Sequence, residues 1–568
     1  MARPLAAVPP LPSQPGSGFF KTPALVPVLA ALWIILIIFV LYPAAKLLLV
    51  TFTVDGSFSL QNFSAIWDSS YDRKALWNSL FLGVCVALSG TFLGFCFAYF
   101  TVRMRVNPVL KWLIATLTLL PLISPPFTSS VALTLALGPN GIILTFLGIP
   151  QVSFYGFWGT WIAETLTYFP VAYLALAAVL VSLDPSMEDA ALSLGASPWR
   201  VFRTVTLPMC TPGLANSLLL LFANSLADFA TPLVLAGHSF PVLPTQAYLQ
   251  ITGLYDLTGG AALSFLLLIP ALAAYLMQHY WVSRKSYVTI TGKSGARSSI
   301  KGMGRMGEAF VFCLCVGVTL FVIFLYALIF MASFVKVFGV NNTFTLEHFQ
   351  YVFLHGNKAI KDTLIVACLA TPIGGLLAVV IGYITHTKKF LGNRFLDFTC
   401  MLNYALPGTV VGIAYILAFN EEPLLLTGTL TILVSAYIFR YFAAGIRSVV
   451  ASLHQIDKNI EEASRSLGAG AVRTFFKVTL PLVIPAVLAG MRYLFIHSMT
   501  AISATIFLVS VNWTLLTTRI LECMTGLQFA QASAFSVVLI GLVFMGSGSM
   551  TWLAKQYSTR LAGGVKEI

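Results

Sequence analysis

Two polar stretches hold the side chains whose types and spacing could do chemistry. They are EDAALSLGASPWRVFRTVTLP, residues 188–208, and EEASRSLGAGAVRTFFKVTLP, residues 461–481. Each begins with two acidic residues, passes a glycine, continues with basic and aromatic residues and closes on Val-Thr-Leu-Pro. Acidic residues favour a helix N-terminus, and the glycine permits a sharp change of direction. This order predicts a short rigid arm that docks on a partner, which is a binding function.

A solvated amphipathic loop on the membrane surface is the alternative interpretation of either stretch taken alone. Two copies at matching places, with the internal spacing kept, favour docking. The residues expected to form the two arms are Glu188, Asp189, Ala190, Gly195, Arg200 and Pro208, then Glu461, Glu462, Ala463, Gly468, Arg473 and Pro481.

Ionisable residues also occur inside apolar runs, where a charge is costly and often functional. Asp228 could face a substrate pathway, as a carboxylate suited to a cation, or cap a helix that breaks near Pro232. Glu164 could line the passage or lie near the outer interface. Arg440 could meet an anion, although pairing with Glu164 is the favoured interpretation. His497 fits a hydrogen-bonding core residue better than a metal ligand.

Two proline motifs interrupt apolar runs. They are PLISPPF, which contains Pro125 and Pro126, and ALPG at 405–408. Irregular backbone inside a membrane is tolerated where it lines a cavity, so we expect these breaks near the outer mouth or at a gate. Nearby aromatic residues are expected to pack between spans and not to bind ligand: Tyr168, Phe169, Tyr437 and Tyr441. No cluster of carboxylates and histidines predicts a metal site.

Catalytic and nucleotide-binding motifs are missing from the sequence. TGKS at 291–294 lacks the first glycine of a P-loop, because Tyr287 occupies that position, and it follows an apolar run instead of a strand. No His-Glu-x-x-His or Gly-x-Ser-x-Gly motif occurs. The eight cysteines show no C-x-x-C spacing and are expected to be buried small apolar residues. We therefore predict no enzymatic activity and no bound cofactor.

Composition requires a lipid environment. The 568 residues are 58% hydrophobic and 9% charged, whereas soluble domains carry about 25% charged residues. Because a span needs about 20 apolar residues, we predict an all-α integral membrane protein with about twelve transmembrane helices. These lie near 25–51, 77–102, 112–137, 154–183, 209–236, 260–282, 308–335, 362–386, 395–419, 424–450, 482–510 and 531–554. The first run is too long for a signal peptide and is expected to be retained. The segment 137–153 is expected to be an outer loop.

Basic residues predict the orientation. One set of loops is rich in Lys and Arg, and the opposite set is richer in acidic residues such as Asp68, Asp256 and Glu421. The basic side is expected to be cytoplasmic, with both termini inside. This distribution accounts for much of the net charge of +13, so the high charge does not predict nucleic-acid binding. The basic loops contain Arg103, Arg105, Lys111, Arg200, Arg203, Arg284, Lys285, Lys388, Lys389, Arg394, Arg473, Lys477 and Lys555.

The sequence repeats itself. FSLQNFSAIW at 58–67 matches FTLEHFQYVF at 344–353, and the two arms follow at equivalent places. An even number of spans in each half predicts two parallel six-helix repeats with a pathway between them, although a purely structural duplication is the alternative. The predicted organisation is a cytoplasmic tail 1–24, a first transmembrane domain 25–282 with arm 186–208, a basic cytoplasmic linker 283–306, a second domain 307–556 with arm 459–481, and a cytoplasmic tail 557–568.

Both arms resemble the EAA loop of ABC-importer permeases of the MetI-like, binding-protein-dependent type: acid-Ala-Ala, three residues, Gly, then Leu-Pro. In this register Asp189 and Glu462 are the acids, and Gly195 and Gly468 are the glycines. Asp189 replaces the usual Glu, and Ser464 replaces the second Ala. The resemblance implies that each loop is a coupling helix for a cytoplasmic ATPase. Two ATPase copies carrying ATP and Mg, and a periplasmic substrate-binding protein, are the implied partners.

Further segments resemble fused two-domain permeases of the ferric-iron type: LPLISPPF at 120–127, SLADFATPLVLAG at 225–237, TQAYLQITGLYD at 245–256 and RKSYVTITGK at 284–293. The resemblance implies a bacterial inner-membrane subunit that translocates ferric iron, driven by ATP hydrolysis on a separate chain. Uptake of 2-aminoethylphosphonate, thiamine or sugar phosphate is the alternative within the same mechanism. A secondary transporter driven by an ion gradient is the alternative from a different class, and the duplicated loop argues against it.

Overall fold

The computed structural model describes residues 25–54, 56–138, 141–148, 154–184, 186–282, 303–387 and 392–564. Within these ranges eleven helices are long and apolar enough to cross a membrane, or up to twelve if the bent pair α19 and α20 forms one span. The predicted all-α membrane fold is confirmed. The strands of the described ranges form two antiparallel hairpins, β1–β2 and β3–β4.

The first half contains, in chain order, α1 (Leu25–Leu36), the π-helical turn η2 (Ile37–Leu41), α2 (Tyr42–Phe52), β1 (Thr53–Val54), β2 (Ser57–Phe58), α3 (Gln61–Asp68), α4 (Ser70–Val102), α5 (Pro108–Thr118), α6 (Leu120–Ile123), α7 (Thr128–Leu137), α8 (Ile142–Leu147), α9 (Phe157–Ser182), α10 (Ser186–Ser193), α11 (Pro198–Val201), η3 (Phe202–Thr206), α12 (Leu207–Ala227), α13 (Ala230–Leu235), α14 (Leu243–Gly253), α15 (Leu257–Leu276) and η4 (Met277–Val282).

The second half repeats this order with α16 (Arg305–Ser333), β3 (Val335–Val337), β4 (Asn341–Phe344), α17 (Glu347–His355), α18 (Asn357–Thr387), α19 (Asn393–Ala405), α20 (Gly408–Phe419), α21 (Leu430–Gln455), α22 (Lys458–Ser466), α23 (Ala471–Thr474), η6 (Phe475–Thr479), α24 (Leu480–Thr500), α25 (Thr505–Leu508), α26 (Leu516–Thr525) and α27 (Phe529–Gly564). In both halves a hairpin and a short helix precede the second span, which supports the predicted parallel repeat.

Each half is built around three packed spans, α4, α9 and α12 in the first and α18, α21 and α24 in the second. Small residues allow the close approach that membrane helices need. A Cβ on Gly94 would lie 2.6 Å from the Cβ of Ala172, and a Cβ on Gly490 would lie 2.6 Å from the Cα of Gly445. These two contacts therefore tolerate only glycine at the present spacing.

The first span of each half packs on the other half. Helix α2 lies against α20, and α16 lies against α4, α5 and α7. One contact between the halves follows from the backbone of the first span. Pro43 has no N–H, so the carbonyl of Phe39, four residues earlier, lacks its usual helical donor. That carbonyl instead accepts from the hydroxyl of Tyr415 at 2.7 Å and from the amide of Asn403 at 3.4 Å, both in the second half.

Several predicted spans are broken. The run 112–137 divides at the proline pair into α6 and α7, because the residue before a proline is disfavoured in a helix. Its counterpart divides into α19 and α20, bent by 107°. The run 209–236 divides after Ala227, and the predicted outer loop 137–153 contains the short helix α8.

Other predicted boundaries move or fall outside the described residues. Helix α27 continues to Gly564, so it includes most of the tail placed at 557–568. Most of the linker 283–306 and all of the N-terminal tail 1–24 lie outside the described residues. The basic loop residues Lys388 and Lys389 also lie outside them.

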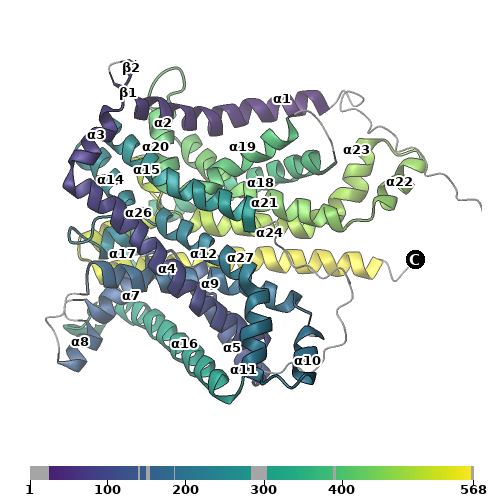
Figure 1. Cartoon of the computed structure of the whole chain (residues 1–568). Helices are drawn as coiled ribbons and strands as arrows, with labels where there is room; N and C mark the ends of the chain where they lie inside the picture. The colour runs from purple at the N-terminus through teal and green to yellow at the C-terminus, as the bar shows by residue number, and fades with distance from the viewer. Residues whose placement is uncertain are drawn as a thin grey trace, which may run out of the picture.

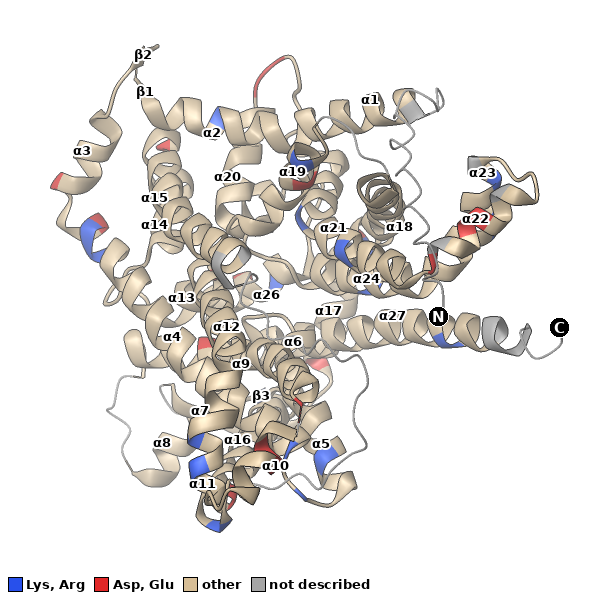
Figure 2. Ribbon diagram, turned by 45° about the vertical axis from the view of Figure 1, so that its right-hand side comes forward, with Lys and Arg blue, Asp and Glu red and all other residues tan. Residues whose placement is uncertain are grey.

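The two arms project from the same side of the bundle. In Figure 1 the pair α10–α11 lies at the bottom, from the centre toward the right, and α22–α23 lies at the upper right, while α3, α8 and the hairpin β1–β2 lie on the left. The start of α1 and the end of α27 also lie on the right. Figure 2 shows acidic and basic residues on the projecting arms and few charges within the bundle.

Candidate functional site

The first arm is fixed to the bundle through Glu188. Its Oε2 accepts from Nη1 of Arg103, at the end of α4, at 2.9 Å, and its Oε1 accepts from the hydroxyl of Thr206 in η3 at 2.8 Å. The side chains of Arg103 and Glu188 are 5% and 12% exposed, so the ion pair is largely removed from water. Gly195 then turns the chain with φ +82°, in the left-handed region that favours glycine.

The second arm repeats this geometry. The hydroxyl of Thr479 donates to Oε1 of Glu461 at 2.9 Å, across the same 18-residue separation as Glu188 and Thr206. Gly468 has φ +84°. The sharp change of direction expected at the glycine of each arm is therefore present, at Gly195 and at Gly468.

Both arms also start in the same way. The carboxylate of Asp184 accepts from the N–H of Ser186 at 2.9 Å, and that of Asp457 accepts from the N–H of Asn459 at 3.0 Å. The hydrogen bond from Ser186 lowers the pKa of the Asp184 carboxyl. These two caps were missed in the sequence, although the acids Asp184, two residues before α10, and Asp457, one residue before α22, were a usable signal.

The register of the resemblance gave Asp189 and Glu462 as the family acids. The hydrogen bonds that join the arms to the π-helical turns are instead made by the preceding acids, Glu188 and Glu461. The remaining predicted arm residues Ala190, Arg200, Ala463 and Arg473 are exposed. Pro208 and Pro481 occupy the first turns of α12 and α24, where proline is tolerated.

Exposed leucines mark the turn of each arm. Leu194 is 89% exposed and Leu467 is 88% exposed, and each directly precedes the turn glycine. The aromatic residues that follow, Trp199 and Phe476, are also more than half exposed. Each arm therefore presents apolar side chains together with charged ones, which is the composition of a docking surface.

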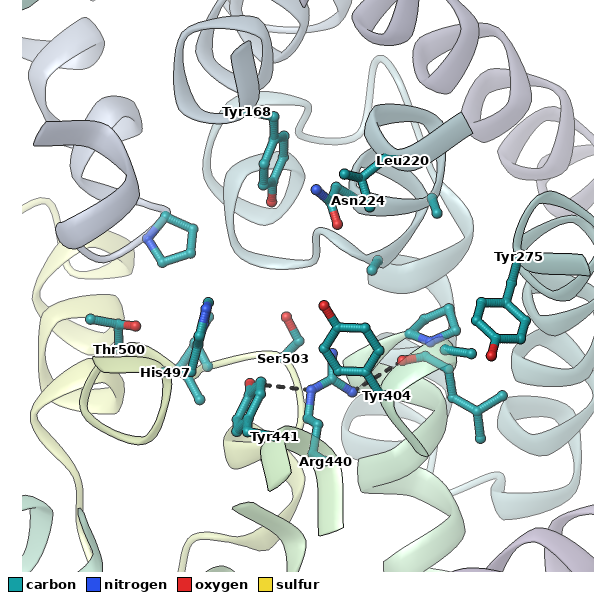
Figure 3. A pocket seen from close by; sticks show the side chains of 18 of the residues that line it. Tyr168, Leu220, Asn224, Tyr275, Tyr404, Arg440, Tyr441, His497, Thr500 and Ser503 are labelled. Carbon is teal, nitrogen blue, oxygen red and sulfur yellow. Dashed lines mark hydrogen bonds between the residues drawn. The ribbon is translucent and has the colours of Figure 1, made fainter. Parts of the chain in front are cut away.

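A cavity of about 230 Å³ lies where the two halves meet (Figure 3). Helices α9, α12 and α15 line it from the first half, and α19, α21 and α24 line it from the second. Extending the alignment of the two arms backwards and forwards without gaps pairs Tyr168 with Tyr441 and Asn224 with His497. All four line the cavity, so equivalent positions of the repeat face one another.

The halves differ in their charged groups. Arg440 lines the cavity, and the equivalent position in the first half is Thr167. Its Nη1 donates to the carbonyl oxygen of Leu406 and its Nε donates to the hydroxyl of Tyr441, both at 3.2 Å. The predicted pairing of Arg440 with Glu164 is wrong, because the hydrogen-bond partner of the Glu164 carboxylate is Ser225.

The two carboxylates of the first half lie behind the cavity wall. Glu164 is 0% exposed and accepts from the hydroxyl of Ser225, so it neither faces the cavity nor reaches the outer interface. Asp228 is 3% exposed, and its Oδ1 accepts from the N–H of Thr231 at 3.3 Å, which caps the start of α13. The cap predicted for Asp228 is present, although the break lies at Asp228 and Phe229 instead of Pro232.

Of the other predicted pathway residues, His497 and Pro126 line the cavity and Pro125 does not. His497 lines the cavity and packs on Tyr441 and Tyr493, with ring centroids 5.1 Å and 4.1 Å away. Pro126 also lines the cavity, and Pro125 directly precedes it at the break after α6.

Among the expected packing aromatics, Phe169 and Tyr437 are buried, whereas Tyr168 and Tyr441 face the cavity. The expectation that cysteines are buried fails at Cys313 on α16 and Cys368 on α18, which are exposed, and at Cys85 on α4, which is half-buried. Within the described ranges no three His, Cys, Asp or Glu residues form a metal-binding group.

Two similar helical halves, a cavity between them and two matching arms on one side define a membrane transport permease. The chain belongs to the family of binding-protein-dependent transport system inner membrane components, whose model matches residues 90–287 and 370–562. It is accordingly a multi-pass inner-membrane protein.

Proteins from three bacteria are similar to this chain in sequence. The ferric transport system permease protein FbpB of Actinobacillus pleuropneumoniae is 34% identical over 527 residues, which cover 90% of this chain and 76% of that protein. The putative ferric transport system permease protein FbpB 1 of Haemophilus influenzae is 36% identical over 504 residues, covering 85% and 78%. The putative 2-aminoethylphosphonate transport system permease protein PhnV of Salmonella typhimurium is 28% identical over 222 residues, covering 38% and 81%.

Proposed function

We propose that this chain is the translocation subunit of an ATP-driven importer that moves ferric iron into the cytoplasm. ATP and Mg bind to a separate ATPase, of which one copy docks on each arm, and a periplasmic binding protein delivers the cargo on the opposite side. Both termini are then cytoplasmic. The substrate rests on the two ferric permease relatives, which align with most of the chain.

The observation that carries the mechanism is the matching pair of arms. Their apolar tips, Leu194 and Leu467, are almost fully exposed to water in this chain. Burying a leucine side chain is favourable by about 1.5–3 kcal/mol, so a partner groove that covers each tip would gain affinity. Because Glu188 and Glu461 hold each arm to its bundle, movement of the docked partner would be transmitted to the spans around the cavity.

Copurification of the ATPase with arm variants tests the proposal. Proline requires φ near −65°, so Gly195→Pro and Gly468→Pro are incompatible with the observed turns and should abolish both recruitment and uptake. Ala471→Pro is the matched control, because it places proline where the first arm already has Pro198 at the start of α11. Unchanged ATPase recruitment by the chain that carries both glycine-to-proline changes would contradict the docking model.

The competing classes of function require different measurements. Uptake that persists with cytosolic ATP after the proton gradient is collapsed supports the importer, whereas uptake that stops would support a secondary transporter. The ligand of the cognate binding protein decides the substrate. If that protein binds 2-aminoethylphosphonate, thiamine or a sugar phosphate and not ferric iron, the iron assignment fails while the ATP-driven mechanism stands.

A further inference from the structure

The charged group in the cavity is a cation. Arg440 is half-buried on α21, and it donates hydrogen bonds to two neutral oxygens, the Leu406 carbonyl and the Tyr441 hydroxyl. None of the ion pairs among the described residues involves Arg440. A guanidinium group has five N–H donors, so most of its donors are available to a ligand.

Neutral hydrogen-bonding groups from both halves surround this cation. In Figure 3 Tyr168 and Asn224 lie above the open space, and Tyr404, Ser503 and Arg440 lie below it. These side chains can donate hydrogen bonds through hydroxyl, amide and guanidinium groups.

No Asp or Glu is among the described residues that line the cavity. The buried carboxylates of Glu164 and Asp228 accept from Ser225 and Thr231, and neither residue lines the cavity. Asp228 also interacts with the Tyr168 hydroxyl, so Tyr168 is less available to a ligand than the other donors. A bare hard cation prefers carboxylate and carbonyl oxygens, and a guanidinium would repel it. Arginine instead matches the geometry and charge of carboxylates and phosphates.

We propose that the cavity accepts an oxyanion held by Arg440, either free or as the ligand of the transported ferric ion. This inference deepens the proposed function, because a ferric ion would then cross as part of an anionic complex and not as a bare ion. The hydroxyl and amide groups contributed by both halves would orient the oxyanion, and Arg440 would supply the charge that selects it.

Labelling with phenylglyoxal, which modifies accessible arginine, tests binding without requiring transport. The full-length chain in lipid nanodiscs is labelled in inorganic phosphate, in ferric citrate and in chloride at equal ionic strength, and modification at each arginine is followed by mass spectrometry. Phosphate or ferric citrate, at about ten times its dissociation constant, should slow labelling of Arg440 about tenfold, because protection rises with occupancy of the site. Arg492 on α24, which is exposed and donates to Thr551, is the internal control and should be unaffected. Equal labelling of Arg440 in all three solutions overturns the proposal.

Uptake by the reconstituted complex provides the second measurement, with ⁵⁵Fe and ³²P-phosphate supplied together and separately. Arg440→Gln should lower uptake about tenfold, Arg440→Lys should restore part of it by retaining the charge, and Arg492→Gln should resemble the parent chain. Phosphate entering alone identifies the free anion as cargo, and joint entry at a fixed ratio identifies the iron complex. Iron uptake that needs no oxyanion and is unaffected by Arg440→Gln overturns the inference but leaves the importer intact. Protection of Arg440 without any ATP-driven uptake contradicts the importer but leaves the oxyanion site intact.

Discussion

At the scale of single residues, the acidic side chains of the two arms differ in how far they are buried. Glu188 and Arg103 form a largely buried ion pair, whereas Glu462 in the other arm is exposed. A buried pair that loses one member leaves an uncompensated charge. Replacing Glu188 should therefore destabilise the arm more than replacing the exposed Glu462.

Glu188→Gln should lower the free energy of unfolding of the first arm by about 3 kcal/mol, because Arg103 is left without its carboxylate. Hydrogen exchange of residues 186–206 in the purified chain measures this loss. Glu462→Gln should change stability by less than about 0.5 kcal/mol, as expected at an exposed site. Equal exchange in the two variants would mean that the ion pair does not hold the arm.

For the exposed leucines of the arms we expect the opposite pattern, a change in partner binding without a change in stability. Leu194→Ser combined with Leu467→Ser should weaken ATPase binding at least tenfold, since each leucine contributes about 1.5 kcal/mol or more when buried. Stability of the isolated chain should remain unchanged, because both side chains are already exposed. Val511→Ser, 93% exposed in the loop before α26, is the control. Binding constants equal to that of the control would exclude the leucines from the interface.

At the scale of elements, a side-chain hydroxyl in each half caps the helix that follows the broken fifth span. The hydroxyl of Ser79 accepts from the N–H of Leu243 at the start of α14 at 2.8 Å. In the second half the hydroxyl of Thr363 accepts from the N–H of Leu516 at the start of α26 at 2.9 Å. Helix N-termini leave unpaired N–H groups, so a hydroxyl from another span acts as a cap.

Thr363→Val should therefore destabilise the start of α26 by about 1 kcal/mol, the usual value of a lost cap. Faster hydrogen exchange at Leu516 would show it. The control is Thr385→Val, because the Thr385 hydroxyl donates only to carbonyls of its own helix, those of Ile381 and Gly382. Unchanged protection of Leu516 would show that its N–H is satisfied in another way.

The break between α6 and α7 belongs to the same scale. Replacing Pro125 and Pro126 by alanine removes the restriction that ends α6 and allows a continuous helix, which would alter the cavity wall at position 126. Uptake, normalised to the amount of inserted protein, should fall more than expression. Pro108→Ala, at the first position of α5, should leave both nearly unchanged. Normal uptake by the double variant would count against a role in the pathway.

At the scale of the whole molecule, the halves are interlocked by their first spans. Helix α2 packs on α20, and α16 packs on α4, α5 and α7, so neither half covers its own apolar surface completely. The hydrogen bond from Tyr415 to the carbonyl of Phe39 crosses this boundary. Stability of one half should therefore depend on the presence of the other.

Tyr415→Phe should lower the thermal stability of the whole chain by an amount corresponding to about 1–3 kcal/mol, because the Phe39 carbonyl would lose its short partner inside an apolar environment. Tyr557→Phe, in the part of α27 that extends beyond the predicted span, is the control. If the two variants unfold at the same temperature, the hydrogen bond from Tyr415 to Phe39 does not stabilise the packing of the first span on the second half.

Much of this molecule was predictable from its sequence. Apolar runs determined the membrane fold, and the duplicated arms determined the repeat and the turn glycines, because these signals are local along the chain. Hydroxyl partners such as Thr206 and Thr479 were visible in the repeated Val-Thr-Leu-Pro segment but were not recognised as contacts of Glu188 and Glu461.

Only the tertiary structure decided which spans are neighbours. It placed α2 and α16 on the opposite halves, left Arg440 facing a cavity without Glu164, and buried both carboxylates behind the wall. The physical reason lies in the bilayer: lipid and protein surfaces are similarly apolar, so hydrophobicity alone does not select a partner helix. Neighbours are chosen by small-residue contacts and by hydrogen bonds such as Tyr415 to Phe39, which join residues far apart in the sequence.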